Sequence, residues 1–255
     1  VLCRRASEEW LDLVQEVGDV VATRGWSAAW GERYPNRTAY RNAMHRLRKR
    51  GLVAYRRDGG KDPVLVLTAE SEARRPPAFL PERYWDRKWG GAWYVMVYDV
   101  PEKDRRYRAA LRGFLRRMRK GCLQGSVWIS AHDIRPDFDD LVKAGGLDNY
   151  AFLFESRTVL GQPARDVVSA AWPYAQLHDL QADYCRATRA NLSRLNTTSA
   201  TDHALLELAR MDIAAYLRVM RDDPLLPRKL WPDGYLGAEA LALHRELSRE
   251  IGRRL

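Results

Sequence analysis

Residues 36–67 read NRTAYRNAMHRLRKRGLVAYRRDGGKDPVLVL, and this stretch decides the fold of the N-terminal part of the chain. Its first half carries apolar side chains at intervals of three and four residues, which form one stripe of a helix: Tyr40, Ala43, Met44 and Leu47. Asn36 is a suitable N-cap, and Gly51 is a suitable C-terminal stop. The pattern therefore predicts a helix between these two residues, buried along one stripe.

The second half of the stretch predicts a β-hairpin. Leu52–Arg57 and Pro63–Leu67 read as two strands, and residues 58–61 contain two glycines that suit the turn between them. Earlier in the chain, residues 8–14 and Trp26–Tyr34 are predicted to form two further helices. A basic helix followed by a short basic hairpin is typical of the winged helix-turn-helix. In that fold the helix enters the major groove of DNA, and the hairpin contacts the backbone or an adjacent groove.

Positive charge is concentrated on this helix and hairpin. Residues 36–61 contain nine Lys or Arg residues and one acid, Asp58, while the net charge of the whole chain is +10. Localised positive charge indicates a nucleic-acid contact surface. The alternative is a solvated helix end, and we favour DNA binding because helix, hairpin and charge coincide. The candidate DNA-binding residues are Arg37, Tyr40, Arg41, Asn42, His45, Arg48, Lys49, Arg56, Arg57 and Lys61.

Length and composition limit the other possibilities. A chain of 255 residues with 46% hydrophobic side chains is long enough for two or three domains. Cys3, Cys122 and Cys185 lie far apart with no CxxC pair, so we expect neither a zinc site nor disulfide bonds. No apolar run approaches the roughly 20 residues of a membrane span, and no signal peptide is visible. We expect a cytoplasmic protein without membrane contact, metal or cofactor, whose basic balance indicates double-stranded DNA as a partner.

The chain is predicted to have an α+β fold in three parts. Residues 1–70 form a winged helix-turn-helix DNA-binding domain, and residues 71–91 form a linker, because consecutive prolines at 76 and 77 do not sustain a helix or a sheet. Residues 92–162 form a central domain for dimerisation or effector binding. Residues 163–255 form a helical C-terminal domain, with helices expected at Arg165–Trp172, Gln176–Leu195, His203–Arg221 and Gly237–Arg254.

The central domain alternates strands and helices. Trp93–Pro101, Cys122–Ser130 and Tyr150–Glu155 read as strands, and residues 104–120 and Pro136–Ala144 read as helices. This order predicts a ferredoxin-like α+β sandwich. The first of these helices carries eight basic residues and one acid. A solvated helix face and a second nucleic-acid contact explain that charge equally well.

Several motifs in the central and C-terminal parts match a known family. Residues 85–89 read W-D-x-x-W, residues 99–102 read D-V-P-E, Arg105 and Arg108 form R-x-x-R, and residues 127–130 read V-W-I-S. Residues 223–227 read D-P-x-L-P, and Gly237 follows. With the winged-helix head, this pattern resembles the phenylacetate-catabolism repressor family (PaaX-like) over nearly the whole chain. Residues 119–122 depart from it, since they lack the family's usual apolar-glycine-aromatic-glycine run.

The resemblance implies a bacterial transcriptional repressor that binds a palindromic operator as a homodimer. In that family, the DNA is released when an aryl-coenzyme A thioester such as phenylacetyl-CoA binds as effector. This ligand is expected between the middle and C-terminal domains. Its candidate contacts, chosen by residue type and by the resemblance, are Arg105, Arg108, Trp128, Trp172 and Trp231.

A second class of function follows from the family's middle domain, which is similar to a small nuclease-type subunit of the CRISPR spacer-acquisition machinery. The alternative is therefore a metal-dependent nuclease or a nucleic-acid adaptor, in which two copies of Asp99 hold Mg²⁺ for phosphodiester hydrolysis. We favour a structural role in which Asp99 orders the strand end before Pro101. His132 and Asp133 are two further candidate metal ligands, and for them too we favour a structural role, in the turn after a strand. No GxSxG, P-loop or GxGxxG motif occurs, so we expect a regulator and not an enzyme.

Overall fold

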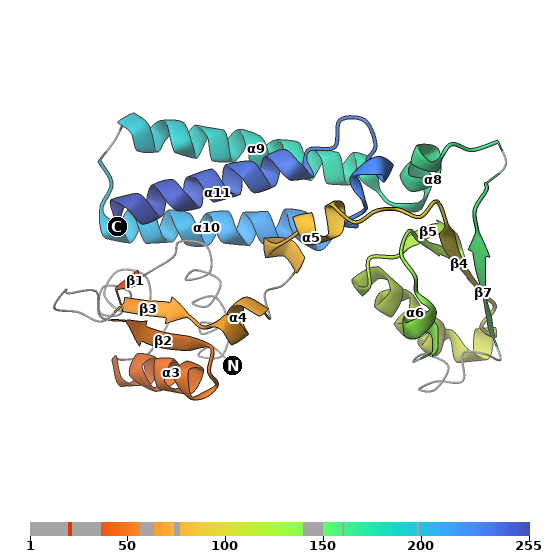
Figure 1. The fold of residues 1–255 in the computed structure, drawn as a ribbon, viewed down its shortest axis with the longest axis horizontal. Helices are drawn as coiled ribbons and strands as arrows, with labels where there is room; N and C mark the ends of the chain where they lie inside the picture. Colours follow the sequence, from red (N-terminus) through yellow and green to blue (C-terminus); the bar gives the residue numbers. More distant parts are fainter. Residues whose placement is uncertain are drawn as a thin grey trace. The chain divides into compact units, whose positions relative to one another are not determined.

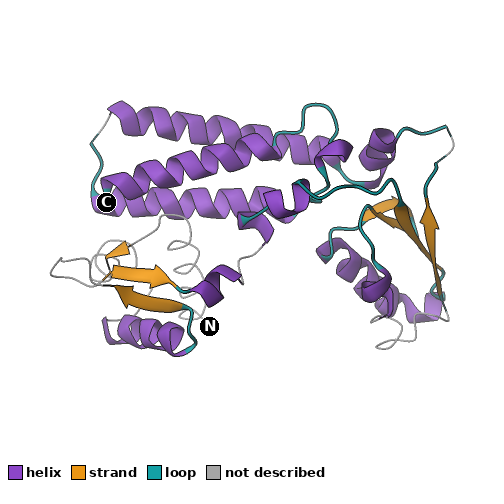
Figure 2. Ribbon diagram, viewed as in Figure 1, coloured by secondary structure: helices purple, strands orange, loops and turns teal. Residues whose placement is uncertain are grey.

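The computed structural model describes residues 20–21, 37–56, 64–73, 77–139, 150–159, 161–197 and 199–255. The described residues form helices and two small antiparallel sheets, which confirms the α+β class. It divides into two compact units, shown in Figures 1 and 2. The first contains the described residues up to Phe79 together with Leu180–Arg221 and Leu236–Leu255, and the second contains Leu80–Asp179 and Asp222–Tyr235. The predicted helices at residues 8–14 and 26–34 and the turn at 58–61 lie outside the described residues.

The first unit contains the predicted basic helix and the two strands that follow it. Helix α3 spans Arg37–Lys49, and strands β2 (Val53–Arg56) and β3 (Val64–Leu67) pair antiparallel, with Val53 opposite Leu67. Strand β1 (Val20–Val21) pairs with the other edge of β3. Gly51 ends α3 with φ +70°, a conformation that glycine adopts without steric cost, and the Leu52 N–H donates to the Leu47 carbonyl at 3.0 Å.

Most of the other described residues of the first unit are helical. It holds most of α9 (Tyr174–Thr197), all of α10 (Asp202–Arg221) and all of α11 (Gly237–Arg254), and the last of these has the bounds predicted from the sequence. Figure 1 shows the three helices running alongside one another. The segment predicted as a linker is partly helical, with α4 at Ala69–Ala73 and a 3-10 turn, η2, at Pro77–Phe79.

A buried polar cluster ties the three long helices together. Asp212 of α10 is 5% exposed and accepts a 2.8 Å hydrogen bond from the Tyr184 hydroxyl of α9. Its other carboxylate oxygen lies 2.6 Å from Nδ1 of His244 in α11. The His244 ring stacks on Tyr216 at 4.0 Å between centroids, and the Tyr216 hydroxyl donates to the Ala78 carbonyl of η2 at 2.8 Å. A buried carboxylate needs such partners, because losing water without them is costly.

The second unit is built on a four-stranded antiparallel sheet in the order β5-β6-β4-β7. This is the strand order of a ferredoxin-like sheet. Its elements are α5 (Glu82–Trp85), β4 (Trp93–Tyr98), η3 (Glu102–Asp104), α6 (Arg105–Arg117), β5 (Gly121–Gln124), β6 (Val127–Ser130), β7 (Ala151–Ser156), α8 (Ala164–Ala171) and η5 (Arg228–Leu230).

One expected strand is in fact a hairpin. Residues 122–130 were predicted as a single strand, but β5 and β6 pair antiparallel, with Cys122 opposite Trp128. Gly125 turns the chain between them with φ +33°. Of the helix predicted at residues 136–144, residues 135–139 are described as helical, and residues 140–149 lie outside the described part.

Two apolar clusters cover the two faces of this sheet. On one face, Met96 and Trp128 pack with Leu111 and Leu115 of α6. On the other, the cluster contains Trp93, Ile129, Val167, Val168, Ala171, Trp172, Leu226 and Leu230. This second cluster brings α8 and residues 226–230 to the same face, although they are distant in the sequence. The two clusters fix the loops that leave the strand ends.

Candidate functional site

Helix α3 separates its buried and exposed faces as the sequence predicted. Tyr40, Ala43, Met44 and Leu47 are each 5% exposed or less. The opposite side presents polar and basic side chains to solvent: Arg41, Asn42, His45, Arg46, Arg48 and Lys49. Arg41, His45 and Arg48 are spaced by four and three residues, so they form one row on the helix. Within the described part of the chain, no acidic side chain forms an ion pair with Arg41, His45 or Arg48.

Helix α3 packs beside strand β2. The Arg48 guanidinium lies 5.6 Å from the centroid of the Tyr55 ring on β2. Arg37 begins α3 and Arg56 ends β2, and their side chains are not described. Arg57 and Lys61 lie outside the described residues. Because Tyr40 is buried, it belongs to the packing stripe, and we leave it out of the contact set proposed below.

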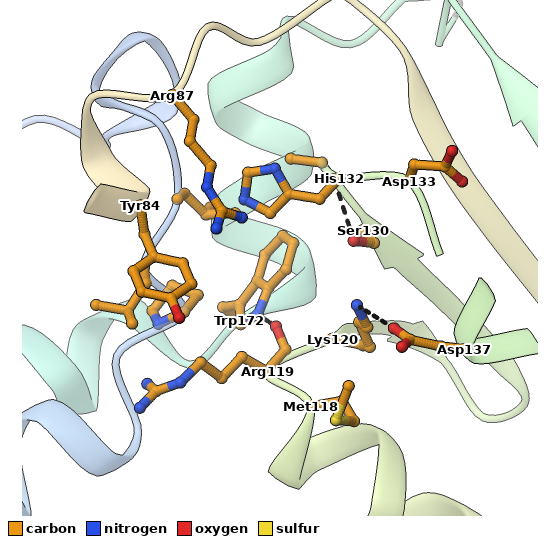
Figure 3. A pocket seen from close by; sticks show the side chains of 14 residues that line it. Tyr84, Arg87, Met118, Arg119, Lys120, Ser130, His132, Asp133, Asp137 and Trp172 are labelled. Atoms are coloured by element: carbon orange, nitrogen blue, oxygen red, sulfur yellow. Dashed lines mark hydrogen bonds and ion pairs between the residues drawn. The ribbon is translucent and has the colours of Figure 1, made fainter. Parts of the chain in front are cut away.

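A pocket of about 240 Å³ lies within the second unit, at the end of the sheet (Figure 3). Its walls come from five segments that are distant in the sequence: Tyr84 and Arg87, Met118–Lys120, Ser130–Asp133 with Asp137, Trp172, and Pro224–Leu226. Four of these residues bring a cationic or titratable nitrogen to the pocket: Arg87, Arg119, Lys120 and His132. The remaining lining residues are aromatic or aliphatic, or carry a carboxylate or, at Ser130, a hydroxyl.

The loop that follows α6 places two of these cations. Arg119 has φ +58°, and the Lys120 N–H donates to the Leu115 carbonyl at 3.0 Å, which is the helix-ending motif usually built on glycine at this position. Arg119 donates a hydrogen bond to the Asp223 carbonyl through its guanidinium. Lys120 forms an ion pair with Asp137 at 3.3 Å, and its side chain is 11% exposed. A non-glycine residue in this conformation destabilises the fold by about 1–2 kcal/mol. We therefore expect the interactions of the Arg119 side chain to offset this cost.

Trp172 is held against the same loop. Its indole Nε1 donates to the Arg119 carbonyl at 3.1 Å. Gly121 makes this approach possible, because a Cβ atom on Gly121 would lie 2.8 Å from Ala171 Cβ and 2.8 Å from Trp172 Cε2. The indole therefore forms a fixed apolar wall beside the two cations.

His132 is electrically neutral at pH 7. Burial, reinforced by the positive charges of Arg87 and Lys120, lowers the pKa of His132 to about 4. Its Nε2 atom is buried and has no hydrogen-bond partner among the described residues. Asp133 does not offset the positive charge inside the pocket, because Arg135 binds both of its oxygens at 2.6–3.0 Å. Burial also lowers the pKa of Lys120, and the neighbouring Asp137 opposes that effect.

The residues predicted to contact an effector are not all in this pocket. Trp172 lines it. Trp128 is 1% exposed in the core under α6, and Arg105 and Arg108 lie on α6 itself. Trp231 packs edge-on against Trp85 at 5.4 Å. The pocket also contains Arg87, Arg119, Lys120 and His132. The sequence had pointed to residues 119–122 as a departure from the family pattern and to His132 with Asp133 as a weak metal pair.

The carboxylates considered for a metal are separated in the described part of the chain. Asp99 is exposed after β4, and its backbone N–H donates to the Tyr150 carbonyl at 2.8 Å. Among the described residues, no three His, Cys, Asp or Glu side chains lie close enough together to hold a metal ion. A search of the same residues finds no helix with the length and apolarity needed to cross a membrane.

Comparison with known proteins finds a family match within the second unit. Residues 86–168 match the family described as the PaaX protein central Cas2-like domain. Among solved structures, an uncharacterised protein, Rv0674, from Mycobacterium tuberculosis is similar, with a TM-score of 0.56 and 20% sequence identity. The match covers 100% of this chain and 97% of that one, and at this identity it supports the fold alone. No curated protein matches the chain.

Proposed function

Because this chain is PaaX-like, with the central domain of that family at residues 86–168, we propose that it is a transcriptional repressor of phenylacetate catabolism. It binds a palindromic operator in double-stranded DNA as a homodimer. An aryl-coenzyme A thioester such as phenylacetyl-CoA releases it from the DNA. The family is one of regulators, and in this proposal the protein acts as a regulator and not as an enzyme.

The observation that carries the DNA-binding part is the exposed basic row on α3. Arg41, His45 and Arg48 point away from the buried stripe and lie beside the β2–β3 pair. Arginine binds the O6 and N7 atoms of guanine through two parallel hydrogen bonds, and every Lys or Arg on a phosphate releases counterions. In the proposed complex, Arg37, Arg41, Asn42, His45, Arg48 and Lys49 contact the major groove or phosphates, and Arg56, Arg57 and Lys61 contact the backbone.

The exposed aromatic side chains of β7 support the proposed dimer. Phe152 and Phe154 are 68% and 52% exposed, on the edge strand of the four-stranded sheet, with ring centroids 6.4 Å apart. They pair with Val97 and Val95 of β4, so all four side chains share one face of the sheet. Large apolar side chains on an open edge favour association, because burying each contributes about 1.5–3 kcal/mol. A second copy of the chain is the partner that a palindromic operator requires.

A fluorescence-anisotropy titration tests the DNA-binding part. The full chain is titrated against the DNA upstream of its own gene at about 50 and about 200 mM salt. Arg41→Ala and Arg48→Ala are compared with Arg249→Ala, which removes an exposed arginine of α11. We expect selective binding that both α3 variants weaken, with a salt slope reduced by about one for each lost phosphate contact. Equal affinity for operator and unrelated DNA, or equal binding by all three variants, would remove α3 from the interface.

A further inference from the structure

We propose that the pocket between the end of α6, the end of β6 and α8 is an oxyanion-binding site, which takes the phosphoryl or carboxylate group of the regulatory ligand. The pocket consists of Arg87, Arg119, Lys120, His132 and Trp172 with their neighbours in the second unit. Its regulatory role rests on the proposed function. Its occupancy is a property of the protein without DNA and can be measured separately.

The charges inside the pocket favour an anion. Arg87, Arg119 and Lys120 carry three positive charges, while Asp137 is the carboxylate that pairs with Lys120. Asp133 is already bound by Arg135 on its outer side. A lysine ammonium has three N–H donors, so its pairing with Asp137 leaves donors for a second acceptor. Hydrogen bonds between charged groups in a partly buried site are about twice as strong as neutral ones.

The imidazole of His132 is the strongest single indication that this pocket binds a ligand. Its Nε2 atom is buried, has no hydrogen-bond partner among the described residues, and lies on a side chain that lines the pocket. Figure 3 shows the imidazole and the Arg87 guanidinium reaching the pocket from different segments. An oxyanion there accepts a hydrogen bond from the imidazole and offsets the repulsion that Arg87 and Lys120 exert on its protonated form. The lone buried nitrogen then acquires a partner.

The pocket is large enough to hold only one part of a larger ligand. A volume of about 240 Å³ lies below the roughly 300–1,000 Å³ of pockets that enclose a drug-sized molecule. The pocket therefore accommodates an anionic end group lying against the Trp172 ring, and not a whole coenzyme A thioester. Two sources carry this chemistry: a phosphate of the coenzyme, or the carboxylate of a free aryl acid.

The conformation of Arg119 agrees with this role. The chain has an arginine where the helix-ending motif favours glycine, and Arg119 begins the segment 119–122 that departs from the family pattern. Arg119→Gly keeps the helix end, because glycine adopts φ +58° freely. It removes one cation from the pocket, together with the hydrogen bond to the Asp223 carbonyl. This variant separates the turn from its charge.

The test is calorimetric titration of the full chain, without DNA, with four probes: inorganic phosphate, phenylacetate, coenzyme A and phenylacetyl-CoA. Lys120→Met and Arg87→Gln are compared with Lys103→Met, which removes an exposed lysine outside the pocket. We expect at least one probe to bind, and both pocket variants to weaken it roughly tenfold or more while the control does not. Absence of binding by all four probes, or equal losses in all three variants, would overturn the proposal.

The pattern of binding distinguishes the two sources. Binding of coenzyme A and its thioester without phenylacetate identifies a phosphate of the coenzyme, whereas binding of phenylacetate identifies a carboxylate. Proton NMR of the histidine ring supplies a second readout, with His132→Asn assigning the signal. The bound anion raises the pKa of His132, because its negative charge counteracts burial and the positive charges of Arg87 and Lys120, in the same direction as the nearby carboxylates of Asp133 and Asp137. A His132 titration that is unchanged by a saturating probe would place that probe elsewhere.

Failure of this site and failure of the proposed function give different results. Lys120→Met is expected to bind operator DNA as the unchanged chain does, since it lies in the second unit and the basic row lies in the first. If the chain binds operator but the pocket variants leave effector release intact, the oxyanion site is wrong and the repressor stands. If the pocket binds its anion but no DNA is recognised, the site stands and the repressor does not.

Discussion

Gly121→Ala tests whether the loop after α6 and Trp172 are packed as tightly as the structure shows. The added Cβ would lie 2.8 Å from Ala171 Cβ and 2.8 Å from Trp172 Cε2, whereas carbon atoms in contact are normally about 3.5–4.0 Å apart. Both neighbours are buried, at 5% and 6% exposure, so neither moves freely. Overpacking of this kind costs about 1–3 kcal/mol. The direction is informative, because alanine is otherwise the better residue inside a strand.

Differential scanning calorimetry measures this cost. At roughly 2–4 °C per kcal/mol for a domain of this size, the melting temperature should fall by about 2–12 °C. Gly90→Ala is the matched control, because its added Cβ meets no atom within 4 Å, and we expect its stability to stay within about 0.5 kcal/mol. If Gly121→Ala and Gly90→Ala have the same melting temperature, Trp172 does not pack against Gly121 as closely as the structure shows. Anion binding should weaken in parallel, because the clash displaces one wall of the pocket.

Three further predictions concern other groups. The pKa of His132 falls from 6.5 to about 4 on folding, so between these pH values only the unfolded chain takes up this proton. The stability of the fold should therefore drop as the pH falls from 6.5 to about 4. Thermal melts over this range should show a smaller drop for His132→Asn. Asp212→Ala leaves Tyr184 and His244 without their acceptor and should destabilise the first unit by about 3–5 kcal/mol in urea unfolding, while a loss below about 1 kcal/mol would refute the network. Phe154→Asp should lower the mass measured by sedimentation to that of one chain, and an unchanged dimer mass would exclude this face.

Much of the secondary structure follows from local pattern. The stripe of α3, the glycine at its end and the paired strands after it were predicted from spacing and turn residues, and α11 has its predicted bounds. The β5–β6 hairpin was missed because Gly125 and Ser126 were read as part of one continuous strand. Asp212 is buried on α10, and its partners Tyr184 and His244 come from other helices, which spacing along one helix does not reveal.

The candidate pocket was beyond the reach of sequence reasoning for a related reason. Its cations come from separate segments, at Arg87, Arg119, Lys120 and His132, and packing alone brings them together. Residue type and the family resemblance favoured Trp128 and Trp231 as ligand contacts, and in the structure both side chains pack against other apolar or aromatic residues. The one local signal was the arginine in a position that suits glycine.

The division into two units has a consequence for synthesis on the ribosome. The first unit ends with Leu236–Leu255, and the second includes Asp222–Tyr235, which holds Trp231 against Trp85. Neither unit is therefore complete until nearly the whole chain has emerged, and a fragment ending at residue 179 lacks part of both. Long-range closure of this kind slows folding, because the intervening chain must be ordered first. The nascent protein therefore has both units complete only after residues 222–255 have been synthesised.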